Sequence, residues 1–127
     1  MTIIDTKYFT PQEAQKTLPL VKSIVKDIIR CGTELKVISE MDDEAINNNG
    51  DIRHLILEMQ KYIDELEELG CFYKDWSFDI GLVDFPSLID GEEVFLCWRS
   101  DEEKVQHFHS HQGGYAGRKL IPEVYFY

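Results

Sequence analysis

Apolar residues in one segment near the middle of the chain repeat at helical intervals. Between residues 51 and 69 the spacings are 4, 3, 4 and 3, at Ile52, Ile56, Met59, Ile63 and Leu66. This spacing places the side chains on one side of an α-helix. Gly70 follows, and glycine commonly ends a helix. We therefore predict a helix from about Asp51 to Leu69 whose apolar side needs a partner.

The partner is predicted just upstream. Thr10, Pro11 and Glu13 form a capping box with proline at the first helical position. Apolar residues then recur at intervals of three, four and seven: Ala14, Leu18, Val21, Val25, Ile28 and Leu35, widened by Ile24 and Ile38. Pro19 predicts a kink or a second helix beginning near it. With the polar connector 41–51, these segments predict an antiparallel helical hairpin over residues 1–70.

The pattern changes after Gly70. Asp90-Gly91 lies between two apolar runs, which indicates a β-hairpin with a two-residue turn. Counting outward pairs Val83 with Trp98, Asp84 with Cys97, Phe85 with Leu96 and Ile89 with Glu92. An apolar face then carries Val83, Phe85, Val94, Leu96 and Trp98.

The opposite face of this hairpin is polar. It carries Asp84, Cys97 and Arg99, and Asp84 and Arg99 are diagonal neighbours that could form a pair. Pro86 limits its strand to an edge or to the end of its pairing. The last residues, "IPEVYFY", are expected to add another strand.

Three alternate histidines, His107, His109 and His111, precede a glycine-rich turn. Ser100 and Glu103 resemble a second capping box, so a short helix is predicted over residues 101–112, ended by Gly113 and Gly114. In a helix, His107 and His111 would share a side, whereas in a strand all three histidines would line one face. The prediction for the chain is an α+β fold. It is a single domain over 1–127, with the helical hairpin in 1–70 and the β-hairpin, short helix and C-terminal strand in 71–127.

Charge and composition exclude several classes of partner. The net charge is −11, and nucleic acids and anionic membranes are bound through basic residues, so both are disfavoured. No apolar stretch is long enough to span a bilayer, and the first ten residues lack the pattern of a signal peptide. Cys31, Cys71 and Cys97 are widely spaced. We expect them to be reduced and buried in a cytoplasmic protein.

Three kinds of chemistry could use these residues. His107 and His111, with His109 as an alternative, could bind a divalent metal such as zinc, although an exposed polar helix end is the favoured explanation of them. Gly113, Gly114, Gly117 and Arg118 could form a small-anion site, unless Arg118 simply pairs with a local carboxylate. Cys97, Asp84 and His109 could form a nucleophilic arrangement, but a cysteine in an apolar strand is usually packing. No cofactor is identified.

Four stretches of the chain resemble a known family: "FTPQEAQKTLPLV", "GLVDFP", "DGEEVFLCWR" and "FHSHQGGYAGRKLIP". The family is bacterial and is known only as a domain of unknown function, number 2203. The resemblance covers nearly the whole chain. It implies that His109, Glu102 and the segment from Gly114 to Arg118 occupy family positions, whereas His107 and His111 lie outside the motif. The family implies no established activity.

Two functions follow as hypotheses. The first is a self-associating structural or interaction module, expected to be a dimer formed through its helices, with a site for a small anionic ligand. The second is a metal-assisted or small-ligand enzyme with a pocket around Asp84, His109 and Arg118. The candidate ligand-binding residues are Asp84, Arg99, Glu102, His109, Tyr115, Gly117 and Arg118.

Overall fold

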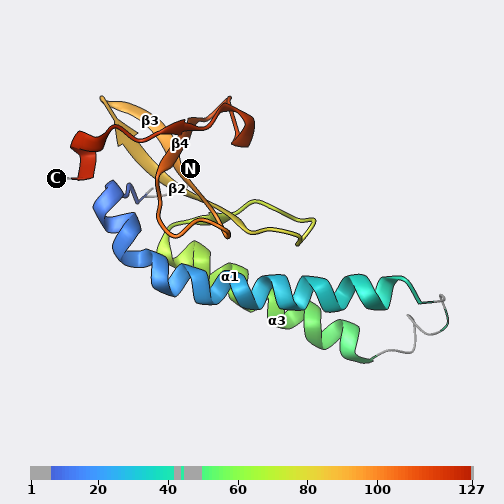
Figure 1. Ribbon diagram of the computed structural model, residues 1–127. Coiled ribbons are helices and arrows are strands. Elements are labelled where there is room, and N and C mark those ends of the chain that lie inside the picture. The colour runs from blue at the N-terminus through green and yellow to red at the C-terminus, as the bar shows by residue number, and fades with distance from the viewer. Residues whose placement is uncertain (1–6, 42–43, 45–49, 127) are drawn as a thin grey trace, which may run out of the picture.

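Two long helices form one half of the molecule. The computed structural model describes residues 7–41, 44 and 50–126. Helix α1 (Pro11–Ser39) begins at Thr10, whose side chain accepts a hydrogen bond from the backbone N–H of Glu13 at 3.1 Å. The helix continues through Pro19, and its first turns are bent relative to the rest (Figure 1). The kink, rather than a second helix, is therefore what accompanies the proline.

The second helix returns alongside the first. Helix α3 (Gly50–Leu69) ends at Gly70, whose φ of 99° is readily adopted by glycine. The predicted connector 41–51 lies largely outside the described residues. Figure 1 shows the far ends of both helices extending beyond the sheet, so the hairpin forms an arm.

Most of the predicted helical seam is used inside the chain. Met59 and Leu66 are buried, and Ile52 and Ile63 are half-buried against α1. The exception is Ile56, which is exposed, while the neighbouring Leu55 is buried in its place. Intramolecular packing therefore occupies the apolar side that the spacing predicted.

A five-stranded antiparallel meander forms the other half. Its strands lie in chain order: β1 (Phe72–Tyr73), β2 (Leu82–Ile89), β3 (Glu92–Arg99), β4 (His107–Ser110) and β5 (Lys119–Leu120). The predicted register of β2 and β3 is confirmed at every pair, including Val83 with Trp98 and Asp84 with Cys97. The predicted α+β class is likewise confirmed.

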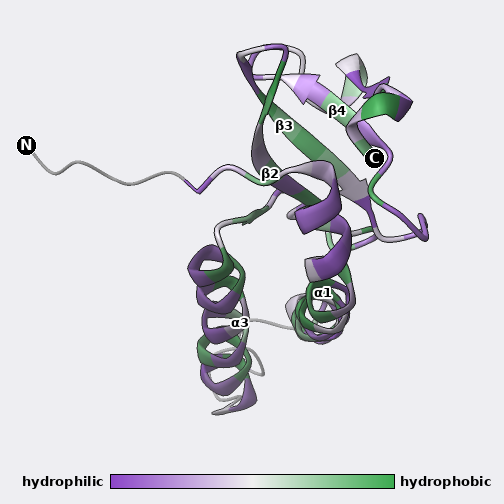
Figure 2. Ribbon diagram, turned by 90° about the vertical axis from the view of Figure 1, so that its left-hand side faces the viewer, coloured by the Kyte–Doolittle hydropathy of each residue, from purple (hydrophilic) through white to green (hydrophobic). Residues whose placement is uncertain are grey.

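The core lies between α1 and one face of the sheet. The predicted apolar face of β2 and β3 is buried in one cluster with α1 side chains such as Leu18, Val21 and Ile28. Figure 2 shows the largely apolar β3 at the centre of the sheet, with polar and apolar residues alternating along the helices. This packing fixes which face of the sheet is left for other chemistry.

The predicted short helix over 101–112 is wrong. Ser100 accepts a hydrogen bond from the backbone N–H of Gly81 instead of capping a helix. Residues 107–110 form β4, because Phe108 reaches the core cluster while its neighbours point the other way, an alternation with period two. The helical content of this region is limited to 3-10 turns at Tyr115–Gly117 and Glu123–Phe126.

The expected C-terminal strand is also shifted. The last strand is β5 (Lys119–Leu120), just before "IPEVYFY", and the described residues of that segment form no strand but include the turn Glu123–Phe126. Within the described residues, neither helix is long and apolar enough to cross a membrane. Cys31, Cys71 and Cys97 are free and buried, as predicted.

Candidate functional site

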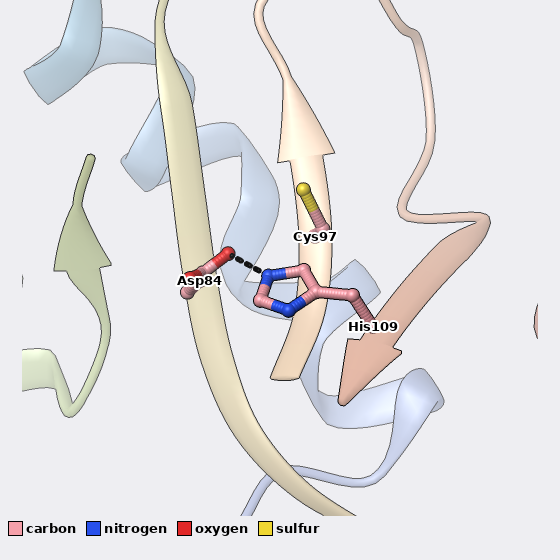
Figure 3. Close-up of side chains that lie close together, drawn as sticks. All are labelled: Asp84, Cys97 and His109. Carbon is pink, nitrogen blue, oxygen red and sulfur yellow. Dashed lines mark hydrogen bonds and ion pairs between the residues drawn. The ribbon is translucent and has the colours of Figure 1, made fainter. Parts of the chain in front are cut away.

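The face of the sheet away from α1 carries a cluster of three different metal-ligand types. Asp84 lies on β2, Cys97 on β3 and His109 on β4. Alternation along each strand turns all three side chains to the same face. Figure 3 shows the His109 ring pointing to Asp84 across the strand that carries Cys97. Residues separated by up to 25 positions in sequence thus meet because the strands form a meander.

These three side chains are close and buried. The Asp84 carboxylate, the Cys97 thiol and the His109 imidazole each offer a ligand atom, and these atoms lie within 4.8 Å of one another. His109 Nε2 lies 3.0 Å from Asp84 Oδ1. Each residue is at most 5% exposed. Buried ionisable groups are retained only where they are paired or bind an ion, so the cluster is a defined polar site.

The orientation of His109 is set by the backbone. Nδ1 lies 2.7 Å from the carbonyl oxygen of Ser110. Because a carbonyl only accepts hydrogen bonds, Nδ1 carries a proton and donates it. Nε2 is therefore the nitrogen directed at Asp84. This is the arrangement by which proteins hold a histidine that binds metal through its other nitrogen.

The same geometry argues against a nucleophilic cysteine. A catalytic histidine uses one ring nitrogen for the nucleophile and the other for its orienting partner. In His109 both are engaged, one by Asp84 and one by the backbone. Burial, assisted by the Asp84 carboxylate, also raises the pKa of Cys97 to about 12. The free thiol is thus held protonated, the opposite of nucleophile activation.

A cavity of about 330 Å³ opens above the cluster. Asp84, Cys97 and His109 contribute to its lining, together with Lys74, Phe95 and Tyr115. His111 lies on the same cavity and packs its ring 4.5 Å from that of Phe95. The cluster therefore faces a space that a small molecule could enter.

The other predicted residues form a separate network beside the cavity. The Arg118 side chain, 10% exposed, donates to both carboxylate oxygens of Glu102 at 2.7 and 2.6 Å. Glu102 also accepts a hydrogen bond from the backbone N–H of Arg99. The Arg118 guanidinium lies 5.1 Å from the centre of the Tyr115 ring. Arg118 thus pairs with the carboxylate of Glu102 inside the protein. Pairing with a local carboxylate was the alternative to an anion site that the sequence left open.

Arg99 does not pair with Asp84 as predicted. It donates to Asp101 at 2.6 Å and to the Tyr115 hydroxyl, whereas Asp84 pairs with His109. The reason is the position of β4, which brings a histidine over β3 to Asp84. Gly117 has open space at its Cα and takes part through its backbone N–H, which donates to Gly113 and Gly114.

The three histidines have three different environments. His107 Nδ1 accepts from Arg118 and lies 3.2 Å from Glu102. Burial and the Arg118 charge lower the pKa of His107. His111 stacks on Phe95, and only His109 belongs to the buried cluster. The helical spacing that would have let His107 and His111 chelate one ion is absent, because this segment is a strand.

Sequence reasoning did not assign Cys97 as a ligand or identify Lys74 and Phe95 as cavity residues. The missed signal is the alternation of His107, His109 and His111. In a strand paired with β3, that alternation puts His109 on the face of Asp84 and Cys97. The prediction of a helix removed this connection.

Comparison with known proteins identifies a family without assigning an activity. A family model described as "Uncharacterized conserved protein (DUF2203)" matches residues 7–121. The match spans helices α1 and α3, strands β1 to β5 and the glycine-rich turn. No curated protein and no solved structure matches the chain.

Proposed function

Because the chain belongs to the DUF2203 family of uncharacterized conserved proteins, we propose a function from the site itself: a domain that binds a divalent transition metal such as zinc. The ligands are Asp84, Cys97 and His109. The observation that carries the proposal is their convergence from three strands onto one buried point. Imidazole nitrogen, thiolate sulfur and carboxylate oxygen are the ligands that zinc prefers.

The geometry supports this proposal. Zinc ligands bound at about 2.0–2.3 Å in a tetrahedron lie roughly 3.3–3.8 Å from one another. Here His109 Nε2 lies 3.0 Å from Asp84 Oδ1, and no two of the three ligand atoms are more than 4.8 Å apart. These distances lie on either side of the zinc range. Small side-chain rotations would therefore bring all three atoms to bonding distance. Metal binding would also displace the Cys97 proton, as it does for coordinating thiols generally.

Three protein ligands leave one coordination position for another group. Structural zinc sites are usually closed by four protein ligands, whereas sites that act on a ligand keep one open. The fourth position here would face the cavity lined by Phe95 and Tyr115. This arrangement favours a site that binds a small molecule over one that only stabilises the fold.

Cobalt(II) provides the test, because it replaces zinc and absorbs light. Chelator-treated protein is titrated with cobalt(II), and we expect one equivalent to bind with a thiolate-to-cobalt absorption band. Cys97→Ser should abolish the band, and Asp84→Asn should weaken binding. Circular dichroism checks that each variant is folded.

A matched control uses another buried cysteine. Cys71 lies in the core and donates to the carbonyl of Leu66, a bond that serine can replace. Cys71→Ser should therefore keep the cobalt band. No band in the wild-type protein, or an unchanged band in Cys97→Ser, would contradict the proposal.

A second candidate, dimer formation through the helical arm, is favoured by exposed apolar side chains. Leu20 and Val37 on α1 and Ile56 and Leu57 on α3 are each more than half exposed. Exposed apolar side chains can mark an interface, and these four are distributed along both helices. Their exposure supports the expected dimer even though the main seam is used within the chain.

Light scattering tests the dimer. We expect a dimer for the wild-type protein and a monomer for the double variant Ile56→Glu, Leu57→Lys. Val124→Lys, which changes an exposed apolar residue outside the helices, should not alter the mass. A wild-type monomer at high concentration would rule this candidate out. The cytoplasm remains the proposed location, supported by the free cysteines.

A further inference from the structure

Lys74 lines the cavity and, within the described part of the chain, has no carboxylate partner. Its backbone N–H is fixed by the carbonyl of Leu82, in continuation of β1. Its ammonium lies 6.0 Å from the centre of the Phe72 ring and 5.9 Å from that of Phe95. Among the described residues, no acidic side chain lies within ion-pair distance of it. This is notable in a chain with 24 acidic and 13 basic residues.

The two arginines near the cavity are already paired with carboxylates. Arg118 pairs with Glu102, and Arg99 pairs with Asp101. Neither can offer its full charge to a ligand without breaking a bond inside the protein. Of the residues that the structure describes around the cavity, Lys74 is therefore the cation available to a bound molecule. The anion site expected at Arg118 is better placed here.

The charges of the proposed centre favour the same ligand class. A divalent ion bound by the carboxylate of Asp84, the thiolate of Cys97 and the neutral imidazole of His109 gives a site with no net charge. Lys74 then adds one positive charge at the edge of the cavity. An anionic ligand would meet both the open metal position and the ammonium, whereas a cationic ligand would be repelled.

The cavity walls suggest the rest of the ligand. Phe95 and Tyr115 line the space with aromatic side chains, and the ring of His111 packs on Phe95. Flat apolar groups pack favourably against aromatic rings. The walls thus fit a ligand with a planar apolar body and an anionic end.

From these observations we propose that the cavity binds a small carboxylate with a planar apolar body, whose carboxylate bridges the metal bound at Asp84, Cys97 and His109 and the ammonium of Lys74. The inference rests on the proposed metal site. It identifies the ligand class and adds Lys74 as the residue that selects for charge.

The test uses benzoate as the probe and cobalt(II)-loaded protein as the receptor. Benzoate should shift the visible absorption of the bound cobalt in a saturable way, and acetate should bind more weakly because it lacks the ring. Benzyl alcohol, which has the ring and no charge, should leave the spectrum unchanged.

Lys74→Met retains the length of the side chain and removes its charge. We expect it to weaken benzoate binding roughly tenfold, the effect of losing one charge-assisted contact, while cobalt still binds at one equivalent. Lys26→Met, on the exposed side of α1, is the control and should bind benzoate as the wild type does.

The outcomes separate the two proposals. Cobalt binding without a benzoate response, or equal benzoate affinity in wild type and Lys74→Met, overturns the ligand proposal and leaves the metal site standing. Equal affinity for acetate and benzoate overturns the aromatic part of the assignment. Absence of cobalt binding in the wild type overturns the metal site and this inference with it.

Discussion

Gly32 of α1 lies directly against the ring of Phe78. A Cβ atom at Gly32 would come within 2.2 Å of Cγ of that ring. Phe78 has little freedom to move away, because its own φ is 61° and its ring packs with Tyr73 and Trp76. Through this contact the loop between β1 and β2 is held on the helical arm.

Gly32→Ala should therefore destabilise the protein. Alanine normally stabilises a helix relative to glycine by roughly 0.5–1 kcal/mol. Here the clash should reverse the sign, with a net loss of about 1–3 kcal/mol, as expected for overpacking. Urea denaturation measures the difference. Gly117→Ala, where the added atom meets open space, should change stability by less than about 0.5 kcal/mol. A more stable Gly32→Ala variant would show that Phe78 does not pack there.

Asp75 fixes the same loop by hydrogen bonds. Burial raises its pKa, but the hydrogen bonds that it accepts from Ser77 and Ile80 outweigh burial and hold the pKa below its usual range. A carboxyl whose pKa is lower in the folded state stabilises the fold above the unfolded pKa of about 3.9 and loses that effect as pH falls further.

The stabilisation from Asp75 should therefore depend on acid pH. Wild type should be more stable than Asp75→Asn near neutral pH, and the difference should shrink as pH falls below about 4. Urea titrations followed by tryptophan fluorescence measure this, since Trp76 lies in the loop. A difference that stays constant from pH 7 to 3 would show that Asp75 does not act through its charge.

At the scale of elements, one ion pair ties the glycine-rich turn to the sheet. Arg118 follows the turn Tyr115–Gly117, and its partner Glu102 follows β3. Glu102 also accepts a hydrogen bond from the backbone N–H of Arg99. The pair thus holds Tyr115 beside the cavity, which makes Arg118 a structural residue for the site.

Removing either partner of this pair leaves the other charge unpaired, so the losses from the two single variants should not add. Arg118→Met leaves the Glu102 carboxylate buried without its cation, and we expect a loss of about 3 kcal/mol. Glu102→Gln leaves the Arg118 charge in the same position. The double variant should lose less than the sum of the two, with a coupling of at least about 1 kcal/mol in urea denaturation. Additive losses would mean that the two side chains do not interact.

Elements could be predicted where one local pattern dominates. The capping box at Thr10 and the Asp90-Gly91 turn fix the start of α1 and the register of β2 with β3, and both predictions are confirmed. The segment 101–112 shows the limit. Its capping signal was local, whereas β4 depends on hydrogen bonds to β3 and on burial of Phe108, which come from contacts distant in sequence.

The candidate site was predictable only in part for the same reason. The hairpin register placed Asp84 opposite Cys97, since that pairing follows from a two-residue turn. The position of His109 depends on how β4 packs beside β3, and no local pattern specifies it. Which carboxylates pair with Arg99 and Arg118 likewise depends on contacts that the fold makes, not on a local pattern.

At the scale of the whole molecule, the helical arm and the sheet have different roles. The helical arm uses one side to cover the sheet and extends beyond it with exposed apolar residues (Figure 1). The sheet uses its other face to gather Asp84, Cys97 and His109. The sheet face that packs on the helices thus provides stability, and the opposite face carries the candidate site with its cavity.

X-ray absorption at the zinc edge tests the central claim most directly, because it reports the atoms bound to the metal. Protein loaded with one equivalent of zinc should show a single sulfur neighbour at about 2.3 Å and nitrogen or oxygen neighbours at about 2.0–2.2 Å. Cys97→Ser should lose the sulfur neighbour, and Cys71→Ser should keep it. A wild-type spectrum without sulfur, or a sulfur neighbour that survives in Cys97→Ser, would contradict a metal centre at Asp84, Cys97 and His109.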